Sequence, residues 1–162
     1  MYNLAFDSDA LIKLAHSGIL VKVCASFNCF TTSKVKEETV DEGKKRLYPD
    51  ADIIDEILER GLIKVRNPRN RIISERNLGK GELSILGLCK SSRNIIVVSD
   101  DQMFISHLEK EYNPFLTPVG VIVLLRKLKK ISLSEALHHL EYIKVFIRID
   151  VYKSAKEDLE DD

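Results

Sequence analysis

Residues 95–104 read IIVVSDDQMF, and they contain the clearest strand pattern in the chain. Four β-branched apolar residues indicate a buried strand. The strand pattern stops at Ser99 and is followed by two adjacent acids, Asp100 and Asp101, before an apolar pattern resumes. One acid after a strand commonly caps the next helix. Two acids at the same point raise a second interpretation, a binding site at the end of a strand.

Strand and helix patterns alternate along the whole chain. The alternation predicts an α/β fold, a parallel sheet with helices on both faces. We place one domain at residues 1–150, and we expect the acidic C-terminal tail, residues 151–162, to fray because it has few apolar residues. Strands are expected at residues 2–6, 30–32, 62–65, 94–99 and 115–119.

Composition excludes several classes of protein. The formal net charge is zero, so any nucleic-acid binding needs a local basic patch rather than a strong overall field. The three cysteines offer neither a disulfide framework nor the spacing of a zinc site. No signal peptide and no membrane-spanning run is visible, so we expect a soluble, cytoplasmic protein.

Acids occur at positions where an acid is costly. Asp7 follows the first strand as Asp100 and Asp101 follow a later one, and sites in open α/β sheets form beyond the carboxyl ends of strands. At helical spacing, Glu82 lies with Ile85 and other apolar residues. A carboxylate there is unfavourable unless it is paired or bound to a cation. The alternative is that Glu82 stabilises the start of its helix and stays hydrated.

Helical periodicity does not choose between Glu37 and Glu38 in the segment SKVKEETV, and surface exposure is the usual state of such acids. Several acids without a His or Cys cluster suggest a hard divalent cation, Mg²⁺ or Mn²⁺. Such an ion activates water for attack at phosphorus. No phosphate-binding glycine motif and no G-x-S-x-G motif is present.

The acid-bearing segments resemble the PIN-domain family of metal-dependent ribonucleases, and most of all its small prokaryotic members related to VapC toxins. FDSDALIKL is similar to the first family motif and matches Asp7 to the first acid and Asp9 to the adjacent polar position. VKEETV matches Val35 and Glu38 to the second motif and makes Glu37 the neighbour. The resemblance extends to about residue 145.

Two later segments complete the resemblance. GKGELSILGL is similar to the segment that carries the third acid, here Glu82. VVSDDQMF matches Ser99 and Asp101 to the fourth motif, with Asp100 between them. Each motif alone is weak, because an acid after a strand is common, and their order along the chain makes the set stronger.

The resemblance implies a PIN-like three-layer fold with a central, mainly parallel sheet flanked by helices. It also implies an Mg²⁺- or Mn²⁺-dependent endoribonuclease in which a metal-activated water cleaves RNA. Asp9 and Ser99 would orient ligands or water, and Arg69, Arg71 or Lys80 would contact the RNA backbone. The metal ligands would come from Asp7, Glu38, Glu82, Asp100 and Asp101, with Asp7, Glu38, Glu82 and Asp101 as the catalytic set.

Relatives of the toxin type pair with a small antitoxin protein and form homodimers, so both are expected partners here. One alternative is a PIN fold with an inactive site that serves as an RNA- or protein-binding module. A second is a receiver-like phosphotransfer domain. A receiver places its acid pair early and a Lys at a late strand end, whereas this chain has its acid pair late.

Overall fold

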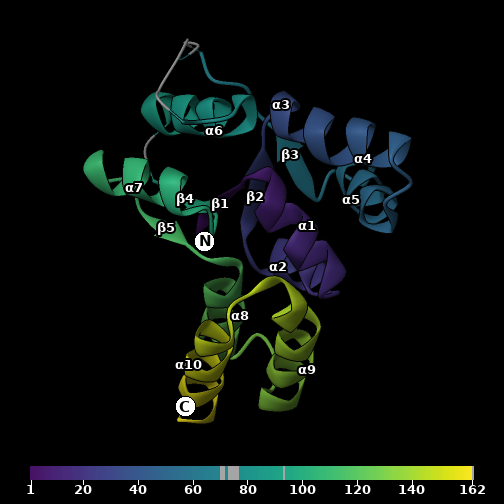
Figure 1. Ribbon diagram of the computed structural model, residues 1–162, viewed down its shortest axis with the longest axis vertical. Coiled ribbons are helices and arrows are strands. Elements are labelled where there is room, and N and C mark those ends of the chain that lie inside the picture. Colours follow the sequence, from purple (N-terminus) through teal and green to yellow (C-terminus); the bar gives the residue numbers. More distant parts are fainter. Residues whose placement is uncertain (70–71, 73–76, 93, 162) are drawn as a thin grey trace.

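The structure is a computed structural model that describes residues 1–69, 72, 77–92 and 94–161. In this part of the chain, five parallel strands form one sheet in the order β3-β2-β1-β4-β5 (Figure 1). The predicted α/β fold with a parallel sheet is therefore confirmed. The strands are β1 (Asn3–Phe6), β2 (Asn28–Thr31), β3 (Ile63–Val65), β4 (Ile95–Val98) and β5 (Phe115–Leu116).

Helices flank the sheet, and one of them changes its winding along its length (Figure 1). The segments α3, η1 and α4 follow each other without a break, and η1 is a π-helical turn between two α-helical ones. The helical segments are α1 (Ser8–His16), α2 (Leu20–Ser26), α3 (Ser33–Lys36), η1 (Glu37–Asp41), α4 (Glu42–Lys45), α5 (Pro49–Glu59), α6 (Lys80–Ser91), α7 (Gln102–Lys110), α8 (Pro118–Lys127), α9 (Leu133–Ile143), η2 (Lys144–Phe146) and α10 (Ile149–Glu160).

The order of the strands decides where a site can form. The chain runs outward from β1 through β2 to β3, and then returns to the other side of β1 with β4. The strand order thus reverses between β1 and β4, and such a switch point leaves a crevice beyond the carboxyl ends of the two strands. Phe6 pairs with Val98 in the register, so Asp7 and Ser99 are the next residues on neighbouring strands.

The predicted strand over residues 115–119 is too long. β5 ends at Leu116 because Thr117 caps α8, with its Oγ1 accepting a hydrogen bond from the Gly120 N–H at 3.0 Å. Pro118 then fits the first position of that helix, where no N–H donor is needed. The apolar pattern continues across this boundary, which is why it did not reveal where the strand stops.

The expectation of a frayed C-terminal tail is wrong. Residues 149–160 form α10, which packs on α8 and α9 at one end of the molecule (Figure 1). Its apolar residues are few, but Tyr152, Ala155 and Leu159 share one buried face of the helix. The division at residue 150 stays a prediction, and it falls within the first turn of this helix.

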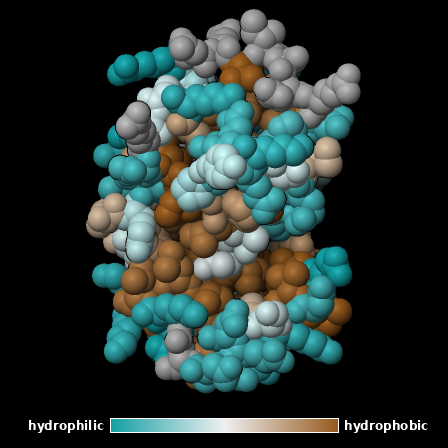
Figure 2. Space-filling model, turned by 90° about the vertical axis from the view of Figure 1, so that its left-hand side faces the viewer, coloured by the Kyte–Doolittle hydropathy of each residue, from teal (hydrophilic) through white to brown (hydrophobic). Residues whose placement is uncertain are grey.

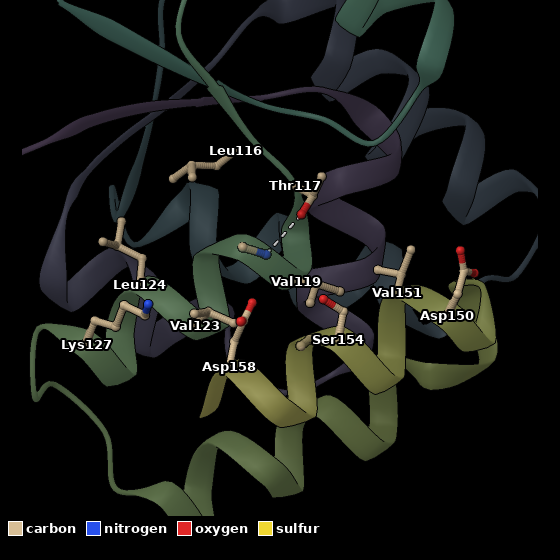
Figure 3. Close-up of a pocket in the computed structure, with 12 residues that line it drawn as sticks. Leu116, Thr117, Val119, Val123, Leu124, Lys127, Asp150, Val151, Ser154 and Asp158 are labelled. Atoms are coloured by element: carbon tan, nitrogen blue, oxygen red, sulfur yellow. Dashed lines mark hydrogen bonds between the residues drawn. The ribbon is translucent and has the colours of Figure 1, made fainter. Parts of the chain in front are cut away.

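Hydrophobic residues gather in the lower half of the face shown in Figure 2. An open groove of about 560 Å³ runs between α8 and α10, with Val123 and Val151 among its lining residues and Lys127, Asp150 and Asp158 as charged ones (Figure 3). None of the acids predicted to bind metal lines this groove. No described helix has both the length and the apolar character needed to cross a membrane.

We predict that Leu159→Ala lowers the free energy of unfolding by about 2 kcal/mol, because it leaves a cavity under α10. Val145→Ala is the control, since Val145 is 76% exposed and its loss should change stability by less than about 0.5 kcal/mol. Urea denaturation of both variants measures the difference. Equal stability of the two variants would show that the packing of Leu159 does not stabilise the fold.

A candidate metal centre at the switch point

The predicted acids meet in one cavity at the carboxyl ends of β1 and β4. The cavity has a volume of about 220 Å³, and acids from four separate segments of the chain line it. Three small residues complete the wall. The lining residues are Asp7, Ser8, Asp9, Glu38, Gly79, Gly81, Glu82 and Asp101.

Asp7 is the most deeply buried of these acids, with 4% of its surface exposed. It is the N-cap of α1, and its Oδ1 accepts a hydrogen bond from the Ala10 N–H at 2.8 Å. Burial raises the pKa of Asp7 to about 7, against the opposing effect of hydrogen bonds from Ser99 and Ala10. The negative charges of Asp9 and Asp100 raise it further. A nearby cation would favour the ionised form of this buried carboxylate.

The structure separates the two acids of the SDD segment. Asp101 is the N-cap of α7, where its Oδ1 accepts from the Phe104 N–H at 2.8 Å, and it also lines the cavity. Asp100 is neither a helix cap nor a lining residue, because its carboxylate pairs with Lys13 at 2.6 Å. The arrangement therefore favours Asp101 as a ligand and does not bring Asp100 into the cavity.

Ser99 connects the two strand ends. It is fully buried, its Oγ accepts from the Asp101 N–H at 3.2 Å, and its side chain is hydrogen-bonded to Asp7. The predicted orienting role of Ser99 thus has contacts on both acids. Asp9 also lines the cavity, and it is exposed to solvent.

The π-helical turn determines which glutamate faces the cavity. Glu38 accepts a hydrogen bond from the Ser8 hydroxyl and another from the Gly81 N–H at 3.0 Å. Glu37 turns away and pairs with Lys34 at 2.6 Å. The hydrogen bond with Lys34 and its positive charge lower the pKa of Glu37. An α-helical projection could not make this distinction, because the π turn inserts an extra residue into the helix.

Glu82 combines the two roles that the sequence left as alternatives. It lies in the first turn of α6, and its Oε2 accepts from the Gly79 N–H at 2.8 Å, which closes the helix start. It is half-buried and lines the cavity as well. Burial raises its pKa, the Gly79 hydrogen bond opposes this, and the nearby acids Asp101 and Glu38 add to the rise.

Sequence reasoning assigned no role to Ser8 or to the two glycines that flank Lys80. Gly81 matters because its backbone lies against Glu38, and a Cβ at this position would come within 3.0 Å of the Glu38 Cδ. The absence of a side chain is what lets the Gly81 N–H reach the carboxylate. The G-x-G-E pattern was a visible signal, but its partner lies 43 residues away in the chain.

The structure places one of the three predicted RNA contacts, Lys80, near the acid cavity. Lys80 is exposed and lines a cavity of about 330 Å³ with Lys34 and Asn67, next to the acid cavity on α6. Arg69 is exposed and lines neither of these cavities. Arg71 lies outside the described residues. Of the three predicted contacts, Lys80 is therefore the one placed beside the acid cavity, and Lys34 lies in the same neighbouring cavity.

The donor set suits a hard divalent cation in its chemistry. The side-chain ligands on offer are carboxylate oxygens, which Mg²⁺ and Mn²⁺ prefer. In the described part of the chain, no three Asp, Glu, His or Cys side chains already stand in a ligating arrangement. Four of the lining carboxylates, those of Asp7, Glu38, Glu82 and Asp101, accept hydrogen bonds from backbone N–H groups or from Ser8.

A family model described as a PIN domain matches residues 3–161. The chain therefore belongs to the PIN-domain family, and its fold is the PIN-like three-layer arrangement of a parallel sheet between helices. PIN domains are generally nucleases and typically use divalent metal ions. No curated protein and no solved structure matches the chain.

We predict that Asp7 makes the metal-free protein less stable as the pH rises from about 4 to about 7. In this range the unfolded chain releases the proton, at a pKa near 3.8, while the folded protein retains it up to about 7. The contribution of Asp7 to the free energy of unfolding then falls by up to about 1.4 kcal/mol per pH unit. Asp7→Asn keeps a capping oxygen but cannot titrate.

Urea denaturation in a chelator, at pH values from 4 to 8, measures the effect as the difference between wild type and Asp7→Asn. The asparagine variant should become the more stable of the two toward pH 7, and the difference should level off above it. Parallel stability curves would contradict the raised pKa of Asp7.

Proposed function

We propose that this protein is an endoribonuclease that cleaves RNA phosphodiester bonds and depends on Mg²⁺ or Mn²⁺. The supporting observation is the convergence of Asp7, Glu38, Glu82 and Asp101 on one cavity at the switch point of the sheet. These four carboxylates would hold the metal. When bound, the ion would lower the pKa of a coordinated water and neutralise charge on the phosphate.

The residues of this chain position the carboxylates before any ion binds. Backbone N–H groups at three helix starts fix Asp7, Glu82 and Asp101. Ser8 and Gly81 orient Glu38, and Ser99 ties Asp7 to the start of α7. Metal binding would then cost less conformational entropy, because these side chains are already ordered.

Lys80 and Lys34 support a path for the RNA backbone beside the acids. Both line the cavity next to the acid cavity, on the α6 side. Lysine contacts to phosphates place the strand without reading its sequence. Arg69 and Arg71 remain further candidates for such contacts, and the net charge of zero makes these local contacts the main electrostatic attraction.

Glu38→Gln and Glu37→Gln form a matched pair that tests the proposal. We expect Glu38→Gln to lower the rate of Mg²⁺- or Mn²⁺-dependent RNA cleavage by more than about 100-fold, above the usual loss for a residue that only orients a ligand. Glu37→Gln should stay within about twofold of wild type, because Glu37 faces solvent and Lys34. The assay follows a labelled single-stranded RNA with added metal and with a chelator.

Two results would contradict the proposal. One is the absence of metal-dependent cleavage by clean, folded wild-type protein. The other is equal cleavage by both glutamine variants, which would point to a contaminating nuclease. Binding of RNA without cleavage would favour the alternative, a PIN fold that serves as an inactive RNA- or protein-binding module.

Gly81→Ala tests the positioning of Glu38. The added Cβ occupies the place of the Glu38 carboxylate, which is the end of an exposed side chain and can move aside. We therefore expect the cleavage rate to fall about 10- to 100-fold while the thermal unfolding midpoint changes little. Wild-type activity in a folded Gly81→Ala variant would show that the Gly81 contact does not matter for the site.

The resemblance to VapC proteins extends this proposal. By that resemblance, the protein would be a cytoplasmic toxin that pairs with a small antitoxin protein and forms a homodimer. Co-expression with the product of a neighbouring short reading frame tests the partner. Loss of growth on expression of wild type, relieved by Glu38→Gln, is the result expected of a toxin. Analytical ultracentrifugation measures the oligomeric state.

A further inference from the structure

A second cavity adjoins the acid cavity and shares Glu38 with it. Its volume is about 490 Å³, more than twice that of the acid cavity, and apolar and aromatic side chains provide much of its lining. We refer to it as the Tyr48 pocket. Its lining residues are contributed by α1, by the stretch from η1 to the start of α5, and by η2.

Two aromatic side chains remain open to solvent in the Tyr48 pocket. Tyr48 is 53% exposed and Phe146 is 39% exposed, although they come from distant parts of the chain. The ring of His16 contacts Phe146 edge-on, with 4.7 Å between centroids, and so supports one side of the pocket. Exposed aromatic rings at one cavity offer surfaces on which a flat, apolar ring can stack.

The turn after α4 leads the chain to Tyr48 at the pocket. α4 ends at Lys45, Arg46 is its C-cap, and Leu47 has a φ of 59°. The Leu47 N–H donates to the Lys44 carbonyl and the Tyr48 N–H to the Gly43 carbonyl, both at 3.0 Å, which is the hydrogen-bond pattern of a Schellman turn. This turn fixes the backbone at Tyr48, whose side chain lines the pocket.

Small residues and one cation, Arg46, line the pocket together with the acids Glu42 and Asp50. Gly43 and Ala51 pack so closely that a Cβ on Gly43 would lie 2.8 Å from that of Ala51. Both residues line the pocket, and both are small. Arg46 lines the pocket, is exposed, and forms no ion pair within the described residues. A guanidinium group binds phosphate and stacks on aromatic or base rings.

We propose that the Tyr48 pocket binds one unpaired base of an RNA strand whose neighbouring phosphate lies at the acid cavity. The inference rests on the proposed nuclease function, since it takes the acid cavity as the place of the scissile phosphate. Tyr48 and Phe146 stack on the base, and Arg46 contacts its phosphate. Glu38 lines both cavities, which places the two next to each other.

Binding of a labelled single-stranded RNA, measured by fluorescence anisotropy in a chelator, tests the pocket without cleavage. Tyr48→Ala should weaken binding about 5- to 150-fold, the loss expected for one stacked base. Tyr48→Phe keeps the ring and should retain binding. Tyr112→Ala is the matched control, because Tyr112 is 95% exposed and lies after α7 outside both cavities.

A strand with an abasic site at each position in turn shows whether a base is recognised. At one position, the abasic substitution should weaken binding to wild type and have no further effect on Tyr48→Ala, since the two changes remove the same contact. Equal effects of Tyr48→Ala and Tyr112→Ala, or additive effects at every position, would overturn the proposal. A pocket for a protein side chain instead would leave RNA affinity unchanged in Tyr48→Ala.

The two proposals fail in different ways. Loss of the Tyr48 effect, with metal-dependent cleavage that still requires Glu38, would remove only the base pocket. Absence of cleavage by wild type, with base-dependent binding at Tyr48, would remove only the nuclease function. Circular dichroism and thermal unfolding confirm that each variant is folded, which is expected because Tyr48 is largely exposed.

Discussion

The parallel pairing of β1 with β4 is the contact on which the site depends. It places the ends of two strands side by side, with Phe6 opposite Val98, so that Asp7 and the Ser99-Asp100-Asp101 segment begin at the same edge of the sheet. Ser99 is buried between the two acids and touches both. Because both neighbouring strands are buried, this register has little freedom to shift.

The carboxylates that cap helices are the same ones that we propose as metal ligands. Asp7, Glu82 and Asp101 each accept a backbone N–H at the start of a helix, and each also lines the cavity. Capping and the positive ends of the helix dipoles offset part of the cost of burying carboxylates and of gathering like charges in a small space. Burial above all, and then the charges of Asp9 and Asp100, still raise the pKa of Asp7. In the proposed function, a bound divalent cation would offset the remaining repulsion.

Site residues could be predicted from the sequence where the neighbouring residues form a clear strand or helix pattern. Asp7, Asp101 and Glu82 could be found because each stands next to a strong strand or helix pattern. Helical periodicity could not separate Glu38 from Glu37, because a π-helical turn begins there, and only the resemblance to the PIN-domain family pointed to Glu38. Ser8 and Gly81 were missed because their partner Glu38 is 30 and 43 residues away. The C-terminal tail was predicted wrongly for a similar reason. Leu159 is buried in α10, and the helices on which α10 packs, α8 and α9, lie outside the local sequence pattern.

By itself, the amino-acid sequence determined the alternation of strands and helices, the position of acids at the ends of strands, and the carboxylate chemistry that suits a hard cation. These are local properties, set by residue type and by spacing over one or two turns. The resemblance favoured Asp101 and Glu38, and the tertiary structure added the contacts: both line the cavity, while Asp100 pairs with Lys13 and Glu37 pairs with Lys34. The tertiary structure alone decided that Tyr48 and Phe146 share a pocket beside the acids. The physical reason is that such contacts join segments far apart in the chain, and only the order and register of the strands bring those segments together.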